Sequence, residues 1–172
     1  MDSSRFNVYI LSLSDKLFRL AKSILQSDDA AQDAVQELNL KLWEKRDKLD
    51  VVDNVPAFAM RSMRNLCLDT LRQHRETGEI QNDVEFTELN PYQQTETNDM
   101  ALRVRQMIDK LPELQRTIIR MRDVEGVEIS EIAYITNLTA NAVTVNLSRA
   151  RQKIREQIMN ENKRVEEKVW RQ

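Results

Sequence analysis

The chain contains very few residues that interrupt a helix. Only 2 glycines and 3 prolines occur among its 172 residues. A sandwich or barrel needs many tight turns, which depend on glycine and proline, whereas long helices need neither. Hydrophobic residues make up 41% of the chain, which is enough for a core. We therefore predict an all-α fold, in one domain or two small ones.

The residues that usually build catalytic or metal sites are scarce. The chain has one histidine, His74, and one cysteine, Cys67. A structural zinc site needs four ligands, and a Ser-His-Asp triad and a glycine-rich phosphate loop are equally hard to assemble from this composition. We expect no catalytic residue, metal, cofactor or small-molecule substrate, and we interpret Cys67 as a small buried residue.

No signal for export or for a membrane is visible. The first residues, MDSSRFNVYI, lack a basic segment followed by an apolar run. No stretch approaches the roughly 18 apolar residues that cross a bilayer. We expect a soluble cytoplasmic protein without direct membrane insertion.

Charge is distributed unevenly along the chain. Residues 76–99 hold 7 acidic and 0 basic residues, whereas residues 1–75 carry a net charge of +1 and residues 100–172 one of +4. The acidic segment lacks helical periodicity and contains Gly78 and Pro91. The predicted organisation is a domain at 1–75, a linker at 76–99, a second domain at 100–157 and a charged tail at 158–172. The linker is either a solvated tether or a strand that occupies a positively charged channel in a partner. The tail frays, extends the last helix or contacts a partner.

Apolar residues at helical spacing predict three helices in the first domain. The first covers 5–25, the second about 29–46 after a cap at Ser27 or Asp28, and the third begins near a cap at Asn54. The predicted core positions of the first two are Phe6, Tyr9, Ile10, Leu13, Leu17, Leu20 and Ile24, then Ala31, Val35, Leu38 and Leu42. A mixed polar and apolar surface lies beside the second stripe and comprises Asp33, Gln36, Glu37 and Leu40. It is either a docking face or ordinary solvated surface.

One face of the third helix is strongly basic. Four arginines recur at helical spacing on this face, against the single acid Asp69, and the stripe comprises Arg61, Arg64, Asn65, Leu68, Arg72 and Arg75. The planar guanidinium fork suits phosphate groups. The stripe therefore indicates either phosphate contact or a solvated basic face.

The second domain is predicted to begin with two helices. The first covers 99–110 and the next about 112–123. Along the latter, Arg116, Arg120 and Arg122 are expected to project between the apolar residues.

A helix-turn-helix pattern follows. A short helix around Ile132 leads through a turn at Asn137 and a cap at Thr139 into a helix that starts at Ala140. Residues 140–155 contain four basic residues and no acid. This arrangement is typical of proteins that read DNA, and the alternative is an ordinary helical hairpin.

Both halves, in this order, resemble a bacterial RNA polymerase sigma factor of the extracytoplasmic-function (ECF) group. The resemblance covers about residues 5–157 and is carried by the segments AAQDAVQELNLKLW, NVPAFAMRSMRNLCLDTLRQ, LPELQRTIIRMRDVEGVEISEIA and NAVTVNLSRARQKIRE. It implies two helical domains, regions two and four, joined by a flexible linker. The implied function is that of a promoter-specificity subunit, which binds core RNA polymerase, recognises the minus-ten and minus-thirty-five elements and promotes DNA opening.

The resemblance also implies three sets of contact residues. The residues implied to dock on a coiled coil of the largest polymerase subunit are Asp33, Gln36, Glu37 and Leu40. Contact with the minus-ten element, where a base is flipped and captured with help from the loop at 48–55, falls to Arg61, Arg64, Asn65, Asp69 and Arg72. Contact with the minus-thirty-five element falls to Ala140, Asn141, Thr144, Asn146, Ser148 and Arg149. The linker would run through the nucleic-acid channel of the polymerase, and an anti-sigma factor is an expected partner.

Some positions depart from the common family pattern. Glu128 replaces a capping serine, Asn137 replaces a turn glycine, and Thr144 and Asn146 stand where lysine or arginine is frequent. The fold should survive these changes, but the base preference of the recognition helix should differ. Alternative functions are a free-standing regulator, which would bind its operator tightly as a dimer, a helical adaptor and, least supported, an enzyme. The arginine stripe argues against the regulator, because a sensor domain has no need of it.

Overall fold

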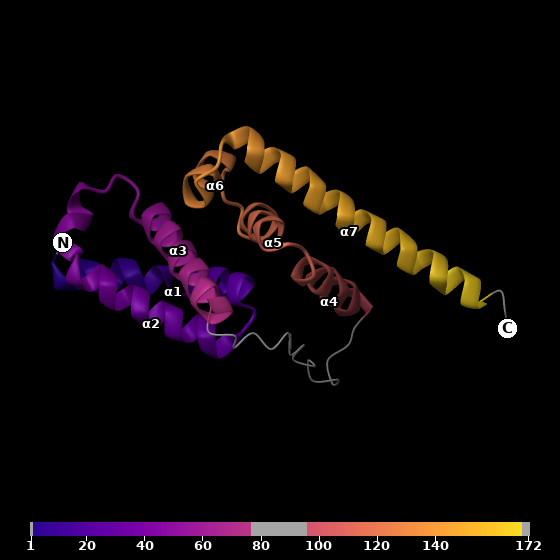
Figure 1. Cartoon of the computed structure of the whole chain (residues 1–172), viewed down its shortest axis with the longest axis horizontal. Coiled ribbons are helices and arrows are strands. Elements are labelled where there is room, and N and C mark those ends of the chain that lie inside the picture. The colour runs from indigo at the N-terminus through magenta and orange to yellow at the C-terminus, as the bar shows by residue number, and fades with distance from the viewer. Residues whose placement is uncertain (1, 77–95, 170–172) are drawn as a thin grey trace.

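The computed structural model describes residues 2–76 and 96–169, and all the regular elements in these ranges are helical, as predicted (Figure 1). In the first range they are α1 (Ser3–Leu25), α2 (Asp28–Glu44), the 3₁₀ turn η1 (Arg46–Val51) and α3 (Val55–Glu76). In the second range they are α4 (Glu96–Asp109), α5 (Glu113–Ile119), the π-helical turn η2 (Arg120–Val124), α6 (Ile129–Thr136) and α7 (Ala140–Val169). Among these helices, none combines the length and the apolar character needed to cross a membrane.

Side-chain caps define where the N-terminal helices begin. The Ala30 N–H donates to the Ser27 hydroxyl at 3.3 Å, and the Ala57 N–H donates to Asn54 Oδ1 at 2.9 Å. Each cap satisfies one of the backbone donors that the first turn of a helix leaves unpaired. Both predicted caps, Ser27 and Asn54, are therefore confirmed.

The three N-terminal helices bury one apolar face each. Most of the predicted stripe of α1 is buried, but Tyr9 is 47% exposed, so its assignment to the core is wrong. In α2 the buried positions are Ala31, Ala34, Leu38 and Leu42. Ala34 takes the place predicted for Val35, which packs at the edge of the core. Residues three apart and residues four apart both fall on the same side of a helix, so spacing alone does not decide between these two positions. Trp43 closes one end of the core, with its ring 5.1 Å from that of Phe6 and edge-on to it.

The predicted helix over 112–123 is two elements. Pro112 has an extended conformation, with φ −52° and ψ 144°, so α5 starts at Glu113. The chain then widens into η2, where the Glu125 N–H bonds to the carbonyl of Arg120, five residues back. Gly126 follows with φ +70°, a conformation that glycine adopts without strain.

The helix-turn-helix has the predicted turn and cap. Asn137 adopts a left-handed conformation, with φ 57° and ψ 40°, and the Ala142 N–H donates to the Thr139 hydroxyl at 3.1 Å. The second helix, α7, continues for 30 residues. The tail extends this last helix, as far as Val169, which was one of the alternatives predicted for it.

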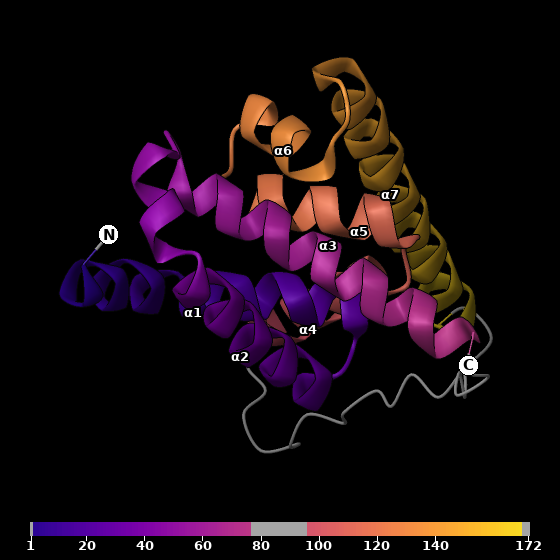
Figure 2. The ribbon, with the colours of Figure 1, turned by 60° about the vertical axis from the view of Figure 1, so that its left-hand side comes forward.

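The two domains pack against each other. Helix α3 lies along α6 and helix α1 lies along α5, and Figure 2 shows this arrangement from a second direction. Buried residues of both domains form one continuous apolar cluster. The sequence left this packing open. Most of the predicted linker, residues 77–95, lies outside the described residues, and helices occupy Glu76 and residues 96–99 at its two ends.

Candidate docking and nucleic-acid surfaces

The docking surface predicted on α2 points away from the core. Asp33, Gln36, Glu37 and Leu40 are all exposed, and Leu40 is 66% exposed. They follow helical spacing, opposite the buried stripe of the same helix. Lys41 Nζ lies 2.6 Å from Glu37 Oε1. The surface thus presents one leucine surrounded by hydrogen-bonding side chains, which is the composition of an interface anchor with a polar rim.

The minus-ten residues predicted on α3 divide into an open and a covered group. Asn65, Asp69 and Arg72 are exposed, and they follow Arg61 and Arg64 along the helix. Arg72 Nη1 donates to Asp69 Oδ1 at 3.0 Å, across one turn. These three side chains are accessible to a nucleic acid without any rearrangement.

The covered group consists of Arg61 and Arg64. The Arg61 guanidinium lies over the ring of Tyr134, 4.8 Å from its centre, and Nη2 donates to Asn137 Oδ1 at 3.4 Å. The Arg64 side chain is only 11% exposed, and its Nη2 lies 3.8 Å from Glu113 Oε2. The C-terminal domain therefore covers the Arg61 and Arg64 part of the predicted minus-ten surface. One buried polar atom in this contact, Arg64 Nε, has no hydrogen bond in the described part of the chain.

The minus-thirty-five residues predicted on α7 lie mainly on its exposed face. Ala140, Asn141, Thr144, Ser148 and Arg149 are exposed. Asn146 is half-buried, and its Nδ2 donates to the Ala142 carbonyl at 2.9 Å. Arg151, on the same helix, is held in a bidentate pair with Asp123, at 2.6 and 3.0 Å. The basic charge of α7 is thus partly engaged within its own domain.

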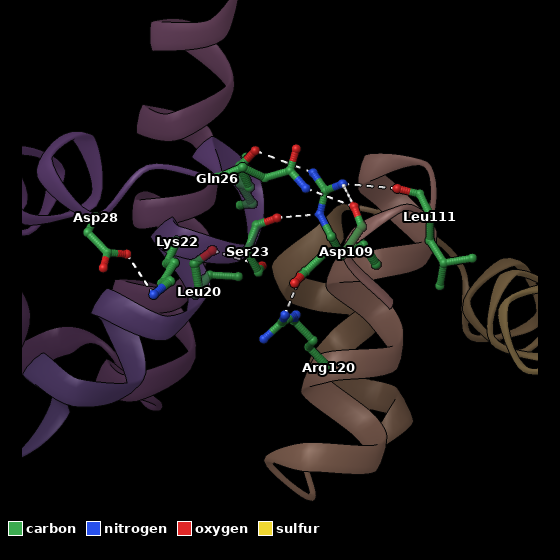
Figure 3. Close-up of polar contacts among 10 residues, drawn as sticks. Leu20, Lys22, Ser23, Gln26, Asp28, Asp109, Leu111 and Arg120 are labelled. Carbon is green, nitrogen blue, oxygen red and sulfur yellow. Dashed lines mark hydrogen bonds and ion pairs between the residues drawn. The ribbon is translucent and has the colours of Figure 1, made fainter. Parts of the chain in front are cut away.

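Arg116 was expected to project between the apolar residues of its helix, and in the structure its side chain is buried between the two domains. Only 6% of it is exposed. Nη1 donates to the carbonyls of Asp109 at 3.1 Å and Leu111 at 2.9 Å, Nη2 donates to that of Ile24 at 3.4 Å, and Nε donates to that of Ser23. Figure 3 shows Ser23 and Gln26 on one side of this site and Asp109 and Leu111 on the other.

One guanidinium thus satisfies carbonyls at the C-terminal ends of α1 and α4 together. These are the carbonyls that a helix leaves unpaired and that carry its partial negative charge. Burial lowers the pKa of Arg116, while Glu113 and Asp109 oppose that effect. The residue pattern had no signal for this role, because all four acceptors are backbone atoms and two belong to the other domain.

Further polar contacts surround Arg116. Gln26 Nε2 donates to the Asp109 carbonyl at 2.8 Å, and Arg120 Nη2 donates to Asp109 Oδ1 at 2.5 Å (Figure 3). Arg19 of α1 forms a bidentate pair with Glu125, whose second bond, Nη2 to Oε2, is 2.9 Å long. This hydrogen bond lowers the pKa of the Glu125 carboxyl. The domain contact is therefore polar as well as apolar.

The described residues do not bring together three or more His, Cys, Asp or Glu side chains that could hold a metal ion. Cys67 is fully buried, as predicted, and its Sγ lies 3.7 Å from Met63 Sδ. Burial, with a smaller effect of Glu113, raises the pKa of the Cys67 thiol to about 12. Such a thiol is a packing residue rather than a nucleophile.

Two family models match this chain, one in each domain. The model of sigma-70 region 2 matches residues 10–77, and that of sigma-70 region 4 matches residues 101–154. Together they span more than half of the chain. The order of the two matches is the order of the two domains described above.

Curated relatives are similar over most of their length. The chain is 24% identical over 169 residues to the ECF RNA polymerase sigma factor SigW of Bacillus subtilis. The matched region covers 91% of this chain and 90% of SigW. It is 26% identical over 146 residues to the RNA polymerase sigma factor SigV of the same species, covering 84% of this chain and 86% of SigV.

Solved structures share the fold. The sigma factor RpoE from Bartonella quintana, in complex with the anti-sigma factor NepR, superposes with a TM-score of 0.70 at 24% identity, over 90% of this chain and 97% of RpoE. CnrH, in complex with the cytosolic domain of CnrY, superposes with a TM-score of 0.67 at 19% identity, over 92% and 90% of the two chains.

Proposed function

Because this chain belongs to the ECF group of the sigma-70 family of RNA polymerase sigma factors, we propose that it is a promoter-specificity subunit. In this proposal it binds core RNA polymerase, recognises a minus-ten and a minus-thirty-five element and promotes DNA opening. It works in the cytoplasm as a transcription regulator rather than as an enzyme. The domain boundaries and the three sets of contact residues given above are part of the proposal.

The observation that carries the proposal is the presence of two separate basic surfaces on one chain. The stripe on α3 supplies arginines to a single-stranded or melted element, and the exposed face of α7 supplies a helix that fits a major groove. A free-standing regulator uses only the second surface. The exposed docking surface on α2, centred on Leu40, gives the chain a third contact, for the polymerase itself.

Promoter opening requires a rearrangement of this structure. Arg61 and Arg64 are covered by α6 and α5, so α3 can meet DNA along its full length only if the two domains separate. We propose that the packed arrangement is the form of the chain without polymerase. Binding of the α2 surface to polymerase and of α3 to DNA then supplies the free energy that is lost when the two domains separate.

An anti-sigma factor is the further proposed partner. RpoE and CnrH, which share this fold, were both solved in complexes, RpoE with the anti-sigma factor NepR and CnrH with the cytosolic domain of CnrY. A partner of this kind would inhibit the chain either by covering the docking surface on α2 or by keeping the two domains together.

The decisive test is gel filtration of the purified chain with bacterial core RNA polymerase, followed by selection of promoters from a random DNA library. We expect co-elution, a selected sequence with two elements, and weak duplex binding by the chain alone. Tight duplex binding alone, without co-elution, would instead establish the free-standing regulator.

Two variants link the selected promoter to α7. Arg149→Ala and Asn141→Ala should each reduce transcription from that promoter, because both side chains are exposed on the proposed reading face. Arg105→Ala is the matched control, since Arg105 is an exposed arginine on α4. Unchanged transcription with Arg149→Ala would refute the assignment of α7 as the recognition helix.

A further inference from the structure

Val145 is exposed in the second turn of α7. It is 38% exposed, whereas Val143 and Leu147, two positions away on either side, are 0% and 5% exposed. Side chains two residues apart in an α-helix point to nearly opposite sides, so Val145 faces directly away from the core. An apolar side chain thus stands at a position where exposure to solvent favours a polar one. Val145 was not among the contact residues predicted from the sequence.

Two further apolar groups lie on the exposed side of α7 near Val145. Ala140 and Thr144 are exposed one turn apart, on a strip of the helix about 100° to 140° around the axis from Val145. The Thr144 hydroxyl donates to the Ala140 carbonyl at 3.0 Å, so its hydrogen is used within the helix and its methyl group remains. The first two turns of α7 therefore present methyl groups from three residues.

Polar and basic side chains border this methyl surface. Asn141, Ser148 and Arg149 are exposed beside it, and Lys153 and Arg155 are exposed further along the helix. The segment 140–155 has no acidic residue, which suits the phosphate groups on both sides of a DNA groove. In a helix-turn-helix, the first turns of the second helix are the part that contacts base edges.

Only one base presents a methyl group in the major groove of DNA, and that base is thymine. Arginine or lysine at position 144 would read guanine, which threonine cannot do bidentately. We propose, on the basis of the function proposed above, that Val145 contacts the 5-methyl group of a thymine in the minus-thirty-five element. Val145 is thus a specificity-determining residue.

The test removes the methyl group from the DNA and the side chain from the protein in turn. Each thymine of the selected minus-thirty-five element is replaced by deoxyuridine, one at a time, and binding of the polymerase holoenzyme is measured. At one position, the affinity of the wild-type holoenzyme should fall about fourfold, because that is the change in affinity expected when one buried methyl group is lost. Val145→Ala should bind the thymine promoter more weakly and should no longer distinguish thymine from deoxyuridine at that position.

Val124→Ala is the matched control, because it shortens an exposed valine of the same domain outside α7. It should keep the wild-type response to deoxyuridine. Equal binding at every deoxyuridine, or an unchanged response in Val145→Ala, would overturn the inference while selection and the Arg149→Ala effect still upheld the proposed function. Failure of the holoenzyme to select any promoter would overturn both.

Discussion

Arg61 of α3 lies over the aromatic ring of Tyr134 of α6, with its guanidinium carbon 4.8 Å from the ring centre. The first residue belongs to the proposed minus-ten surface and the second to the domain proposed to read the minus-thirty-five element. The same arginine donates to Asn137 at the turn of the helix-turn-helix. The two proposed DNA surfaces therefore touch each other, because the turn that precedes α7 also covers part of α3.

Removal of the ring should release Arg61. In the free chain, Tyr134→Ala is expected to raise affinity for a single-stranded minus-ten oligonucleotide about two- to fivefold, the worth of one cation–π contact. Fluorescence anisotropy with a labelled oligonucleotide measures this change. Tyr9→Ala is the control, since Tyr9 is 47% exposed and Tyr134 43% exposed. An unchanged affinity in Tyr134→Ala would show that this contact does not limit DNA binding.

Arg116 should be the most sensitive position in the domain contact. Arg116→Met keeps much of the side-chain length but leaves the carbonyls of Ser23, Ile24, Asp109 and Leu111 without their donor. We expect the free energy of unfolding to fall by about 3 kcal/mol, since buried acceptors lose their partners. Urea denaturation measures this loss.

Arg105→Met is the control for this measurement, because Arg105 is exposed on α4, and it should change stability by less than about 0.5 kcal/mol. Small-angle X-ray scattering gives a second measurement. Arg116→Met should increase the radius of gyration of the free chain, because the two domains would separate. Equal effects of the two variants would refute the role of Arg116 in joining the domains.

The contrast between Arg116 and α2 shows what the sequence could and could not predict. The caps at Ser27 and Thr139, the turn at Asn137 and every predicted helix except the one over 112–123, which is two elements, follow from local residue preferences. The exposure of the docking surface follows from helical spacing alone. The burial of Arg116 and the covering of Arg64 depend on how two domains meet, and no periodicity within one helix contains that information.

The Cys67 thiol should make stability depend on pH in alkaline solution. Burial raises its pKa from 9.0 to about 12, so the unfolded chain releases this proton at a lower pH than the folded chain. Stability is therefore complete below about pH 9 and should fall as the pH rises toward 12, by up to about 1.4 kcal/mol per pH unit. Urea denaturation between pH 8 and roughly pH 10.5 tests this slope. Cys67→Ala should show a smaller slope, because every other titrating group is common to both chains, and equal slopes would contradict the assignment.

The docking surface can be tested by a pair of matched leucines. Leu40 on α2 is 66% exposed and Leu11 on α1 is 68% exposed, so Leu40→Asp and Leu11→Asp should have similarly small effects on folding. Only Leu40 belongs to the surface formed with Asp33, Gln36 and Glu37, where an added carboxylate would be desolvated against the polymerase. We expect Leu40→Asp to weaken binding to core polymerase at least tenfold, as the loss of an interface anchor does, and Leu11→Asp to leave it within about twofold. Biolayer interferometry with immobilised core polymerase measures both. Equal loss in the two variants would place the docking surface across α1 as well, and no loss in either would remove α2 from the interface.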